Sequence, residues 1–315
     1  MRALIITRLG GPEVLAVQNV ADPLSSNGVL VDVRAGGLNF ADLLTAQGGY
    51  PGTPEPPLIA GREFAGVEVS SGRRVMGYEQ YRAFAEKTAA VAELLWTVPD
   101  AWSFEQAAAF PVNFFTAYFA FWKAGLLDKP SGTRVLIHAV AGGVGTAAVQ
   151  IGKILGVEMY GTSSSDEKLA RVKELGLQHG INYKQRDYEE AIKELTGGQG
   201  VDAVFEMLGG EHVAKGVRCL RDFGRLIAYG SATGAKPSID TRSLYEKGTS
   251  VHGLWLSYLS ANRELMDAAW KQLNTWIGDG ALQPIVGHTF PLDQAPDAYR
   301  LMEAGKNYGK IVLQI

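Results

Sequence analysis

The chain has 315 residues, of which 46% are hydrophobic, and a formal net charge of -3 at pH 7. Because a domain usually takes roughly 100 to 200 residues, this length predicts two domains. Neither a basic run nor a basic amphipathic helix occurs, so we expect no nucleic acid and no anionic membrane as a partner. The single cysteine, Cys219, excludes an intrachain disulfide framework and multi-cysteine zinc sites.

The two longest uncharged runs do not predict membrane-spanning helices. Residues 135–152 are interrupted by a glycine turn, and residues 106–122 contain Pro111. The opening residues Met-Arg-Ala-Leu-Ile-Ile lack the extended apolar core of an export signal. We therefore expect a cytoplasmic protein.

The first hundred residues are typical of an irregular β domain. Short β-branched runs such as 29–33 and 67–69 alternate with glycine and proline clusters. At Ser103-Phe-Glu-Gln the predicted secondary structure changes from strand to helix, because this capping box opens an alanine-rich helical segment that runs toward Gly125.

From Thr133 onward, short apolar strands alternate with helical patterns, which predicts a parallel, doubly wound sheet. The predicted strands are 135–138, 158–162, a short one at Ile181, 201–206 and 225–229, and the predicted helices are 143–155, 166–175, 188–196 and 211–220. The last part predicts a helix at 263–278, a strand near 287–290 and a terminal strand at 310–315.

The most informative segment is the glycine turn Gly142-Gly143-Val144-Gly145, which lies between a predicted buried strand and a helix start. Glycines let the backbone approach a phosphate closely, and the N-terminal N–H groups of the helix favour an anion. A plain strand-to-helix turn is the alternative. The βα units that follow favour a dinucleotide pyrophosphate site.

The end of the second predicted strand indicates which dinucleotide binds. Folds that prefer unphosphorylated NAD usually place an acid about 20 residues beyond the first glycine, at the end of this strand. Here the stretch is Gly161-Thr-Ser-Ser-Ser165, and Glu158 falls near the start of the strand. The sequence therefore favours NADP(H).

A 2′-phosphate also needs a cation, and Lys168 lies in the first turn of the next predicted helix. Tyr183, at the end of the third strand, could pack against the adenosine. A solvated surface lysine and a sheet-edge aromatic are the respective alternatives. The segment Ser164-Ser-Asp-Glu167 also predicts a capping box, which can coexist with phosphate binding.

Four motifs, taken in order, resemble the zinc-independent, zeta-crystallin-like quinone oxidoreductase branch of the medium-chain dehydrogenase/reductase superfamily. They are Gly37-Leu-Asn-Phe-Ala-Asp42, Gly61-Arg-Glu-Phe-Ala-Gly66, Ala107-Ala-Ala-Phe-Pro-Val-Asn-Phe-Phe-Thr-Ala117 and Ala139-Val-Ala-Gly-Gly-Val-Gly145. The resemblance covers essentially the whole chain. It implies an α/β protein with a GroES-like catalytic domain (1–116), a doubly wound Rossmann domain that binds NADPH (117–253), a C-terminal return to the catalytic domain (254–315), and the cofactor in the interdomain cleft.

The resemblance also implies that the site holds no metal. The zinc-dependent alcohol dehydrogenase branch binds catalytic zinc through Cys, His and Cys at positions that here hold Asn39, Arg62 and Val112. These residues are not competent replacements, and the cysteine-rich structural zinc lobe is missing. The five histidines show neither metal spacing nor a nucleophile partner, so we expect them to be structural.

The family's cofactor contacts transfer onto matching positions of this chain. Leu44 stands where many quinone reductases have a tyrosine, which weakens any transfer of substrate preference. Trp255 and Lys310 match positions near the cleft, with interface packing as the alternative. The other implied contacts are Asn39 and Thr116 beside the nicotinamide; Gly142, Gly143, Val144 and Gly145 at the pyrophosphate; Ser163, Ser164, Lys168 and Tyr183 at the adenosine phosphate; and Gly209, Gly230 and Ser231 along the cofactor.

A metal-free site with bound NADPH needs to align C4 of the nicotinamide with an electrophilic carbon and to stabilise the developing charge. Tyr50, in Gln-Gly-Gly-Tyr-Pro, looks like the tyrosine of related enoyl thioester reductases. It is therefore the candidate hydrogen-bond or proton donor, with Asn39 as the second catalytic candidate. A loop aromatic that lines an apolar cleft is the alternative for Tyr50.

Four further side chains are expected to shape the site. Asp42 and Glu63 would order the cleft through structural hydrogen bonds. Phe40 and Phe114 would form apolar walls for a flat substrate.

The sequence thus predicts an NADPH-dependent quinone reductase that acts on a small quinone or α,β-unsaturated carbonyl. An enal, enone or enoyl thioester reductase is the alternative within the enzyme class. An NADPH-binding protein with little turnover is the alternative of another class. Relatives of this branch are often dimers paired through the Rossmann sheet, which implies a homodimer.

Overall fold

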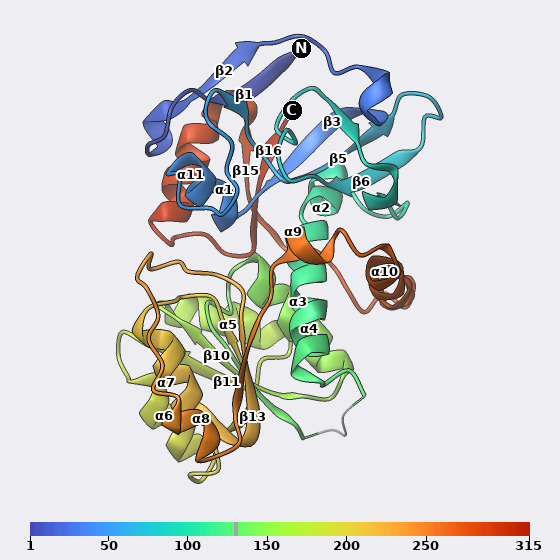
Figure 1. Ribbon diagram of the computed structural model, residues 1–315. Coiled ribbons are helices and arrows are strands. Elements are labelled where there is room, and N and C mark those ends of the chain that lie inside the picture. The colour runs from blue at the N-terminus through green and yellow to red at the C-terminus, as the bar shows by residue number, and fades with distance from the viewer. Residues whose placement is uncertain (129–131) are drawn as a thin grey trace. The chain divides into compact units, whose positions relative to one another are not determined.

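The computed structural model describes residues 1–128 and 132–315 (Figure 1). By their contacts, these residues form two units. The first is made of Met1–Asn113 and Gln283–Ile315, and the second of Phe114–Leu282. Both units combine helices with their own sheets, which confirms the predicted α/β class. No helix in the described part of the chain is both long and apolar enough to cross a bilayer.

The first unit is built on two sheets. Across the described residues, three strands follow the order β2-β1-β4, and seven form a second sheet in the order β15-β16-β3-β5-β6-β8 with β7 paired to β3. Its strands are β1 (Arg2–Ile6), β2 (Leu15–Asn19), β3 (Val29–Leu38), β4 (Leu58–Ile59), β5 (Glu63–Glu68), β6 (Arg74–Tyr78), β7 (Lys87–Ala90), β8 (Leu95–Thr97), β15 (Val286–Pro291) and β16 (Lys310–Gln314). Its helices are α1 (Phe40–Ala46), α2 (Phe104–Ala108) and α11 (Ala295–Glu303), with 3-10 turns at Pro12–Val14, Ser25–Asn27, Ala92–Leu94 and Leu292–Gln294.

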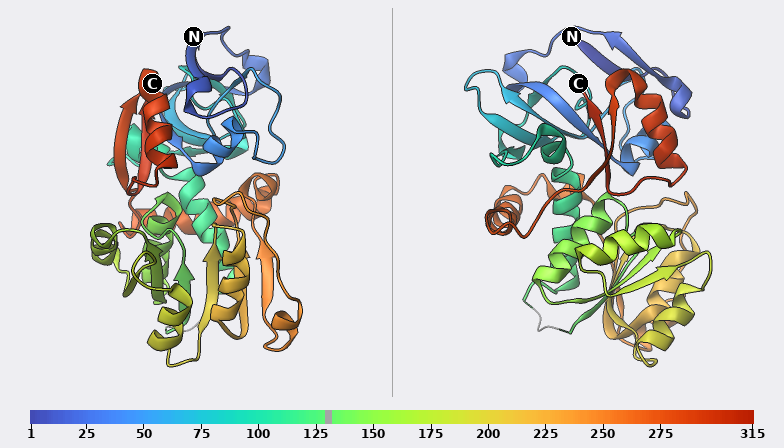
Figure 2. Two further views of the ribbon diagram at one scale, coloured as in Figure 1. Left: turned by 90° about the vertical axis from the view of Figure 1, so that its left-hand side faces the viewer. Right: turned by 180° about the vertical axis from the view of Figure 1, so that it is seen from behind.

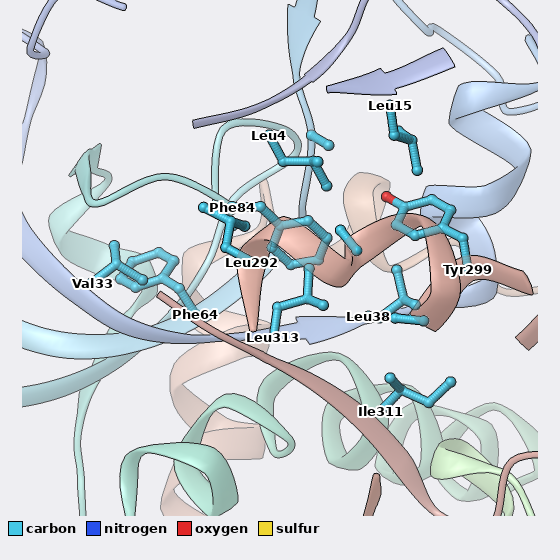
Figure 3. Close-up of a cluster of buried hydrophobic side chains, with 14 of the residues drawn as sticks. Leu4, Leu15, Val33, Leu38, Phe64, Phe84, Leu292, Tyr299, Ile311 and Leu313 are labelled. Carbon is cyan, nitrogen blue, oxygen red and sulfur yellow. The ribbon is translucent and has the colours of Figure 1, made fainter. Parts of the chain in front are cut away.

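The C-terminal strand completes the larger sheet of this unit. β16 pairs antiparallel with β3, with Ile311 opposite Leu38. Lys310 therefore comes next to the residues that follow β3. The core beside this pairing contains Phe84, Tyr299 and Leu313, contributed by distant parts of the chain (Figure 3).

The second unit is a doubly wound sheet. Within the described residues its six strands are all parallel and follow the order β11-β10-β9-β12-β13-β14, so the direction of winding reverses between β9 and β12. Figure 2 shows helices on both faces. The strands are β9 (Arg134–Ile137), β10 (Glu158–Ser163), β11 (His179–Asn182), β12 (Val201–Glu206), β13 (Leu220–Ala228) and β14 (Ser250–Gly253). The helices are α4 (Gly143–Ile154), α5 (Asp166–Leu175), α6 (Tyr188–Leu195), α7 (Glu211–Cys219), α8 (Arg242–Tyr245), α9 (Leu256–Leu259) and α10 (Arg263–Gly278), while α3 (Pro111–Ala124) begins in the first unit and continues into the second.

The alanine-rich segment is two helices rather than one. The capping box is confirmed, since Ser103 Oγ accepts from Gln106 N, but α2 ends at Ala108. Pro111 opens α3, because a residue without an N–H group suits the first turn of a helix.

Residues 254–282 group with the second unit, and not with the first as the sequence predicts. The reason lies in α10. Trp270 packs on Phe115 with ring centroids 6.5 Å apart, and Trp276 packs on Tyr118 at 6.1 Å. These aromatic contacts tie α10 to α3.

Candidate active site

The predicted glycine turn joins β9 to α4. Gly142 is the N-cap, the helix begins at Gly143, and the half-buried Val144 follows. At Gly145 a Cβ would lie 2.4 Å from the carbonyl oxygen of Val140, so only glycine fits without a shift of backbone. The first N–H groups of a helix have no partner within it, and together with the helix dipole they favour an anion here.

Glu158 stands at the first residue of β10, as predicted, and not at the end of that strand. Its carboxylate accepts from Arg134 Nε at 3.1 Å and Tyr160 OH at 2.8 Å, and lies 3.0 Å from His179 Nε2. Partial burial opposes ionisation, but these hydrogen bonds outweigh it and lower the pKa of Glu158. This acid therefore takes part in a hydrogen-bond network at the opposite end of the strand from Ser163.

The carboxyl end of β10 brings two predicted cofactor residues together. Ser163 is the buried last residue of the strand, and its carbonyl oxygen accepts from Tyr183 N at 3.1 Å. The Tyr183 ring is half exposed at 51%. The cap of α5 lies one residue later than predicted, because Ser165 and not Ser164 accepts from Lys168 N, at 3.3 Å. The chain leaves its extended conformation only after Ser165, so Ser164 stays in the loop.

Lys168 lies in the first turn of α5 and is partly buried. Burial lowers the pKa of its ammonium group, Glu167 opposes this, and Lys184 adds repulsion. Lys184 is a second cation at this strand end that sequence reasoning missed. Its position directly after Tyr183, at the end of the third predicted strand, is the sequence feature that could have identified it.

The loops after β12 and β13 meet at the other predicted cofactor positions. Gly209 has a φ of 77°, and a Cβ there would lie 2.7 Å from Ser231 Oγ. A Cβ at Gly230 would lie 2.9 Å from the carbonyl oxygen of Met207. Glu206 Oε1 holds the first loop by accepting from the N–H group of Gly209 at 3.0 Å. Gly209 is therefore favoured by its positive φ, and Gly230 by the close approach of the Met207 backbone.

The remaining two predicted cofactor residues of the second unit differ in exposure. Thr116 is buried within α3 at 6% exposure. Trp255 is the N-cap residue of α9 and is 41% exposed.

In the first unit, Asn39 and Asp42 join β3 to α1. Asn39 N donates to Asp42 Oδ2 at 2.8 Å, which fixes the first turn of the helix. Burial raises the pKa of Asp42 to about 6, although Arg62, the Asn39 N–H group and Lys310 favour its ionised form. The predicted ordering role of Asp42 therefore has a defined hydrogen-bond basis.

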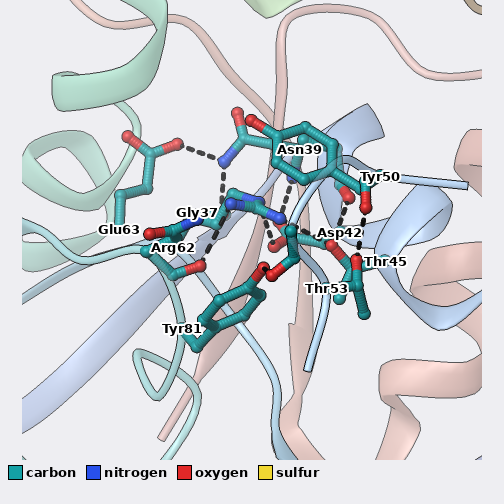
Figure 4. A network of polar contacts seen from close by, with 12 residues as sticks. Gly37, Asn39, Asp42, Thr45, Tyr50, Thr53, Arg62, Glu63 and Tyr81 are labelled. Carbon is teal, nitrogen blue, oxygen red and sulfur yellow. Dashed lines mark hydrogen bonds and ion pairs between the residues drawn. The ribbon is translucent and has the colours of Figure 1, made fainter. Parts of the chain in front are cut away.

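Lys310 and Asn39, 271 residues apart, meet in a buried polar cluster. Lys310 Nζ donates to Asn39 Oδ1 at 2.5 Å and to Asn113 Oδ1 at 3.5 Å, and it forms an ion pair with Glu63 Oε1. Asn39 Nδ2 donates to Glu63 Oε1 at 2.8 Å and to Gly37 O at 3.1 Å (Figure 4). Both amide hydrogens of Asn39 are thus used inside the cluster.

Glu63 is the anion at the centre of this cluster. Its side chain is fully buried, and its second oxygen accepts from Val112 N at 2.7 Å. Buried charges of this kind persist when they are paired and hydrogen-bonded. Asn113 is the member of the cluster that the sequence did not predict. A lone polar residue in an apolar helical run is the feature that could have identified it.

Arg62 forms a second buried group beside α1. Its Nη2 donates to Thr45 Oγ1 at 2.6 Å, its Nη1 donates to Gln80 O at 3.0 Å, and its Nε lies 3.4 Å from Asp42 Oδ1. The guanidinium carbon lies 3.8 Å from the ring centroid of Tyr50 (Figure 4). Tyr50 itself is half-buried in the loop after α1.

The expected apolar walls differ in exposure. Phe40 is partly buried and packs against the core of the first unit. Phe114 is buried in α3 at 2% exposure.

The residues at the three zinc positions do not fit a zinc ion. Asn39 is engaged through both ends of its amide, Arg62 presents a cation, and Val112 has no donor in its side chain. Among residues 1–128 and 132–315, no group of three or more His, Cys, Asp or Glu side chains is placed to hold a metal.

Family models match both units. Residues 143–274 match the model described as zinc-binding dehydrogenase, and residues 25–87 match that of the alcohol dehydrogenase GroES-like domain.

Individual relatives cover almost the whole chain. The synaptic vesicle membrane protein VAT-1 homolog of Danio rerio is 36% identical over 340 residues, which cover 99% of this chain and 69% of that protein. A segment of a phenolphthiocerol/phthiocerol polyketide synthase of Mycobacterium tuberculosis is 35% identical and covers 91% of this chain and 13% of that protein. The quinone oxidoreductase of Thermus thermophilus, solved also as its complex with NADPH, is 34% identical, with a TM-score of 0.88 and 100% of both chains covered.

Proposed function

The chain belongs to the quinone oxidoreductase branch of the medium-chain dehydrogenase/reductase superfamily, and from this membership we propose that it transfers hydride from NADPH to a quinone without a metal ion. The observation that carries the cofactor assignment is the carboxyl end of β10. An NAD-specific fold usually has an acid at this strand end. This chain has Ser163 there, with Lys168 and Lys184 nearby. Hydroxyl groups and cations are what a 2′-phosphate requires.

The second unit would hold the cofactor. In this proposal the N–H groups at Gly142–Gly145 bind the pyrophosphate, because that helix start favours an anion. The contact between the positions of Gly209 and Ser231 supports a backbone surface along which the cofactor lies. When bound, NADPH supplies the hydride from C4 of its nicotinamide.

The first unit would handle the acceptor. As hydride reaches a quinone, negative charge develops on the carbonyl oxygen, and we assign Tyr50 to donate a hydrogen bond or proton to that oxygen. Asn39 keeps its place beside the nicotinamide in this assignment, together with Thr116. Because both amide hydrogens of Asn39 already serve Glu63 and Gly37, it acts by position and not as a donor.

An enal, enone or enoyl thioester reductase is the second candidate. It is favoured by the polyketide synthase segment, which is 35% identical to this chain and covers 91% of it. Such substrates carry the same conjugated carbonyl, so they would make the same demand on Tyr50.

The experiment is the loss of NADPH absorbance with a panel of acceptors: 1,4-benzoquinone, 9,10-phenanthrenequinone, an enal and crotonyl-CoA. We expect the highest kcat/KM with a quinone. A preference for the enal or crotonyl-CoA would select the second candidate. Tight NADPH binding with no oxidation by any acceptor would instead identify an NADPH-binding protein.

Cofactor choice is tested by Lys168→Ala and Lys184→Ala. Each removes one charge-assisted contact, so NADPH binding should weaken about tenfold to a hundredfold while NADH binding stays within about twofold. Lys173→Ala, in the last turn of the same helix, is the matched control. Equal losses for both dinucleotides would exclude a 2′-phosphate role.

We also propose a cytoplasmic homodimer that pairs through the six-stranded sheet of the second unit. Within the described residues β11 and β14 end the order of this sheet, and an end strand offers backbone groups for pairing. Light scattering after gel filtration should give a mass near twice the 33.9 kDa of one chain. A single-chain mass at micromolar concentration would reject the dimer.

A further inference from the structure

Arg62 holds a buried cation that cannot itself reach a substrate. It is among the largest fully buried side chains, and each of its nitrogens faces a fixed group: Thr45 Oγ1, Gln80 O or Asp42 Oδ1. Thr45 Oγ1 and Gln80 O accept from the two terminal nitrogens at the edge of the planar guanidinium, whereas within residues 1–128 and 132–315 Nε makes only the ion pair with Asp42 and no hydrogen bond. Its faces are therefore left for aromatic rings.

Two tyrosines lie against the guanidinium (Figure 4). The ring centroid of Tyr50 is 3.8 Å from its central carbon, and that of Tyr81 is 5.2 Å away. A cation over an aromatic face is attracted by the ring, and more strongly when both are removed from water. The edge contacts hold the guanidinium in place, and its face fixes the orientation of Tyr50.

The loop that carries Tyr50 needs such an anchor. It contains Gly48, Gly49 and Gly52, which allow many backbone conformations. Tyr81 OH donates to Gly52 O at 2.9 Å, and Thr53 Oγ1 donates to Tyr50 O at 2.7 Å. These bonds fix the backbone of the loop, and the Arg62 guanidinium lies against the ring that the loop carries.

We infer that Arg62 is the positioning residue for Tyr50, the acceptor-facing donor of the proposed reaction, and the inference rests on that proposed function. A guanidinium can stack on a ring while its edge bonds to a hydroxyl and a carbonyl, which an ammonium group cannot do. Arg62 stands at one of the three positions where the metal-dependent branch has a zinc ligand.

The kinetic test is a double-mutant cycle of Arg62→Gln and Tyr50→Phe on the full-length protein, with the best acceptor of the panel. Arg62→Gln should lower kcat by about tenfold or more, because small misplacements of a reacting group are costly, and should leave the Kd for NADPH unchanged. In the Tyr50→Phe background the same substitution should cost less than about twofold. Equal losses in both backgrounds would overturn the inference, because Arg62 would then act independently of Tyr50.

Two further variants guard against misfolding and against a general effect of arginine loss. Thr45→Val removes one edge partner and keeps the cation, so it should give a smaller kcat loss that also disappears in Tyr50→Phe. Arg74→Gln is the matched control, since Arg74 lies 4.8 Å from the Phe104 ring in the same unit and bonds to backbone carbonyls. It should leave kcat unchanged.

A second readout does not depend on turnover. The chain has 12 tyrosines, so in protein carrying 3-fluorotyrosine the Tyr50 fluorine signal is assigned by its absence in Tyr50→Phe. Arg62→Gln should shift and broaden that signal, and Arg74→Gln should not. An unchanged Tyr50 signal in Arg62→Gln would show that Arg62 does not hold the ring. If the wild-type protein shows no turnover with any acceptor but Arg62→Gln still shifts the Tyr50 signal, the proposed function is rejected and the positioning of Tyr50 by Arg62 is not.

Discussion

Replacing Glu63 with glutamine tests the buried cluster most directly. Both carboxylate oxygens face donors: Lys310 Nζ and Asn39 Nδ2 at one, Val112 N at the other. A glutamine amide must therefore turn its NH₂ group toward a donor at one of the two ends. It also removes the negative charge that balances Lys310.

The magnitude follows from burial. The side chains of Lys310 and Glu63 are 3% and 0% exposed, so water cannot screen an ammonium that loses its partner. Breaking a buried ion pair by changing one member costs about 3 to 5 kcal/mol of unfolding free energy. In Glu63→Gln/Lys310→Met the unpaired charge is gone as well, so the loss should be smaller than in Glu63→Gln alone.

Urea unfolding followed by circular dichroism at pH 7 measures these differences, and an unchanged m-value shows that the midpoints report stability. Arg2→Gln is the control, because the Arg2–Asp293 ion pair of the same unit is exposed and screened by solvent. The reasoning is refuted if Glu63→Gln costs no more than Arg2→Gln. It is also refuted if the double variant loses the sum of the two single losses.

Three other variants test single features of the structure. Asp42 has a folded pKa of about 6 against an ordinary 3.8, so the stability that its protonation contributes is present below about pH 4 and is lost as the pH rises through 6. Asp42→Asn should therefore flatten the fall of unfolding free energy between pH 4 and 7 by about 3 kcal/mol, and equal slopes in variant and wild type would argue against the raised pKa. Gly145→Ala should cost about 1 to 3 kcal/mol and weaken NADPH binding in a calorimetric titration, because its Cβ would lie 2.4 Å from Val140 O; Gly278→Ala, with nothing within 4 Å, should do neither. Tyr299→Phe should raise the unfolding free energy by about 1 kcal/mol, since the buried hydroxyl has no hydrogen-bond partner within residues 1–128 and 132–315, and a decrease on urea unfolding would mean that the hydroxyl is satisfied.

Local patterns predicted many of the strands and helices of the second unit, but not α8, β14 or α9. The helices Asp166–Leu175 and Arg263–Gly278 and the strand Val201–Glu206 lie where the sequence predicts them. Hydrophobic period and end residues act over a few neighbours, so they can be read in sequence order. The cap of α5 was misplaced by one residue because adjacent serines, Ser164 and Ser165, offer the same hydroxyl.

The candidate site divides in the same way. The sequence by itself determined the glycine turn before α4, the serine-rich end of β10 without an acid, and the lack of zinc ligands at Asn39, Arg62 and Val112, because each depends on which residue occupies one position. Only the tertiary structure decided that Lys310 pairs with Glu63 and Asn39, and that Arg62 lies against Tyr50. Those contacts depend on how β16 pairs with β3 and on how the loop after α1 folds back. Burial then made these charges pair, and no local pattern encodes which distant partner a buried charge meets.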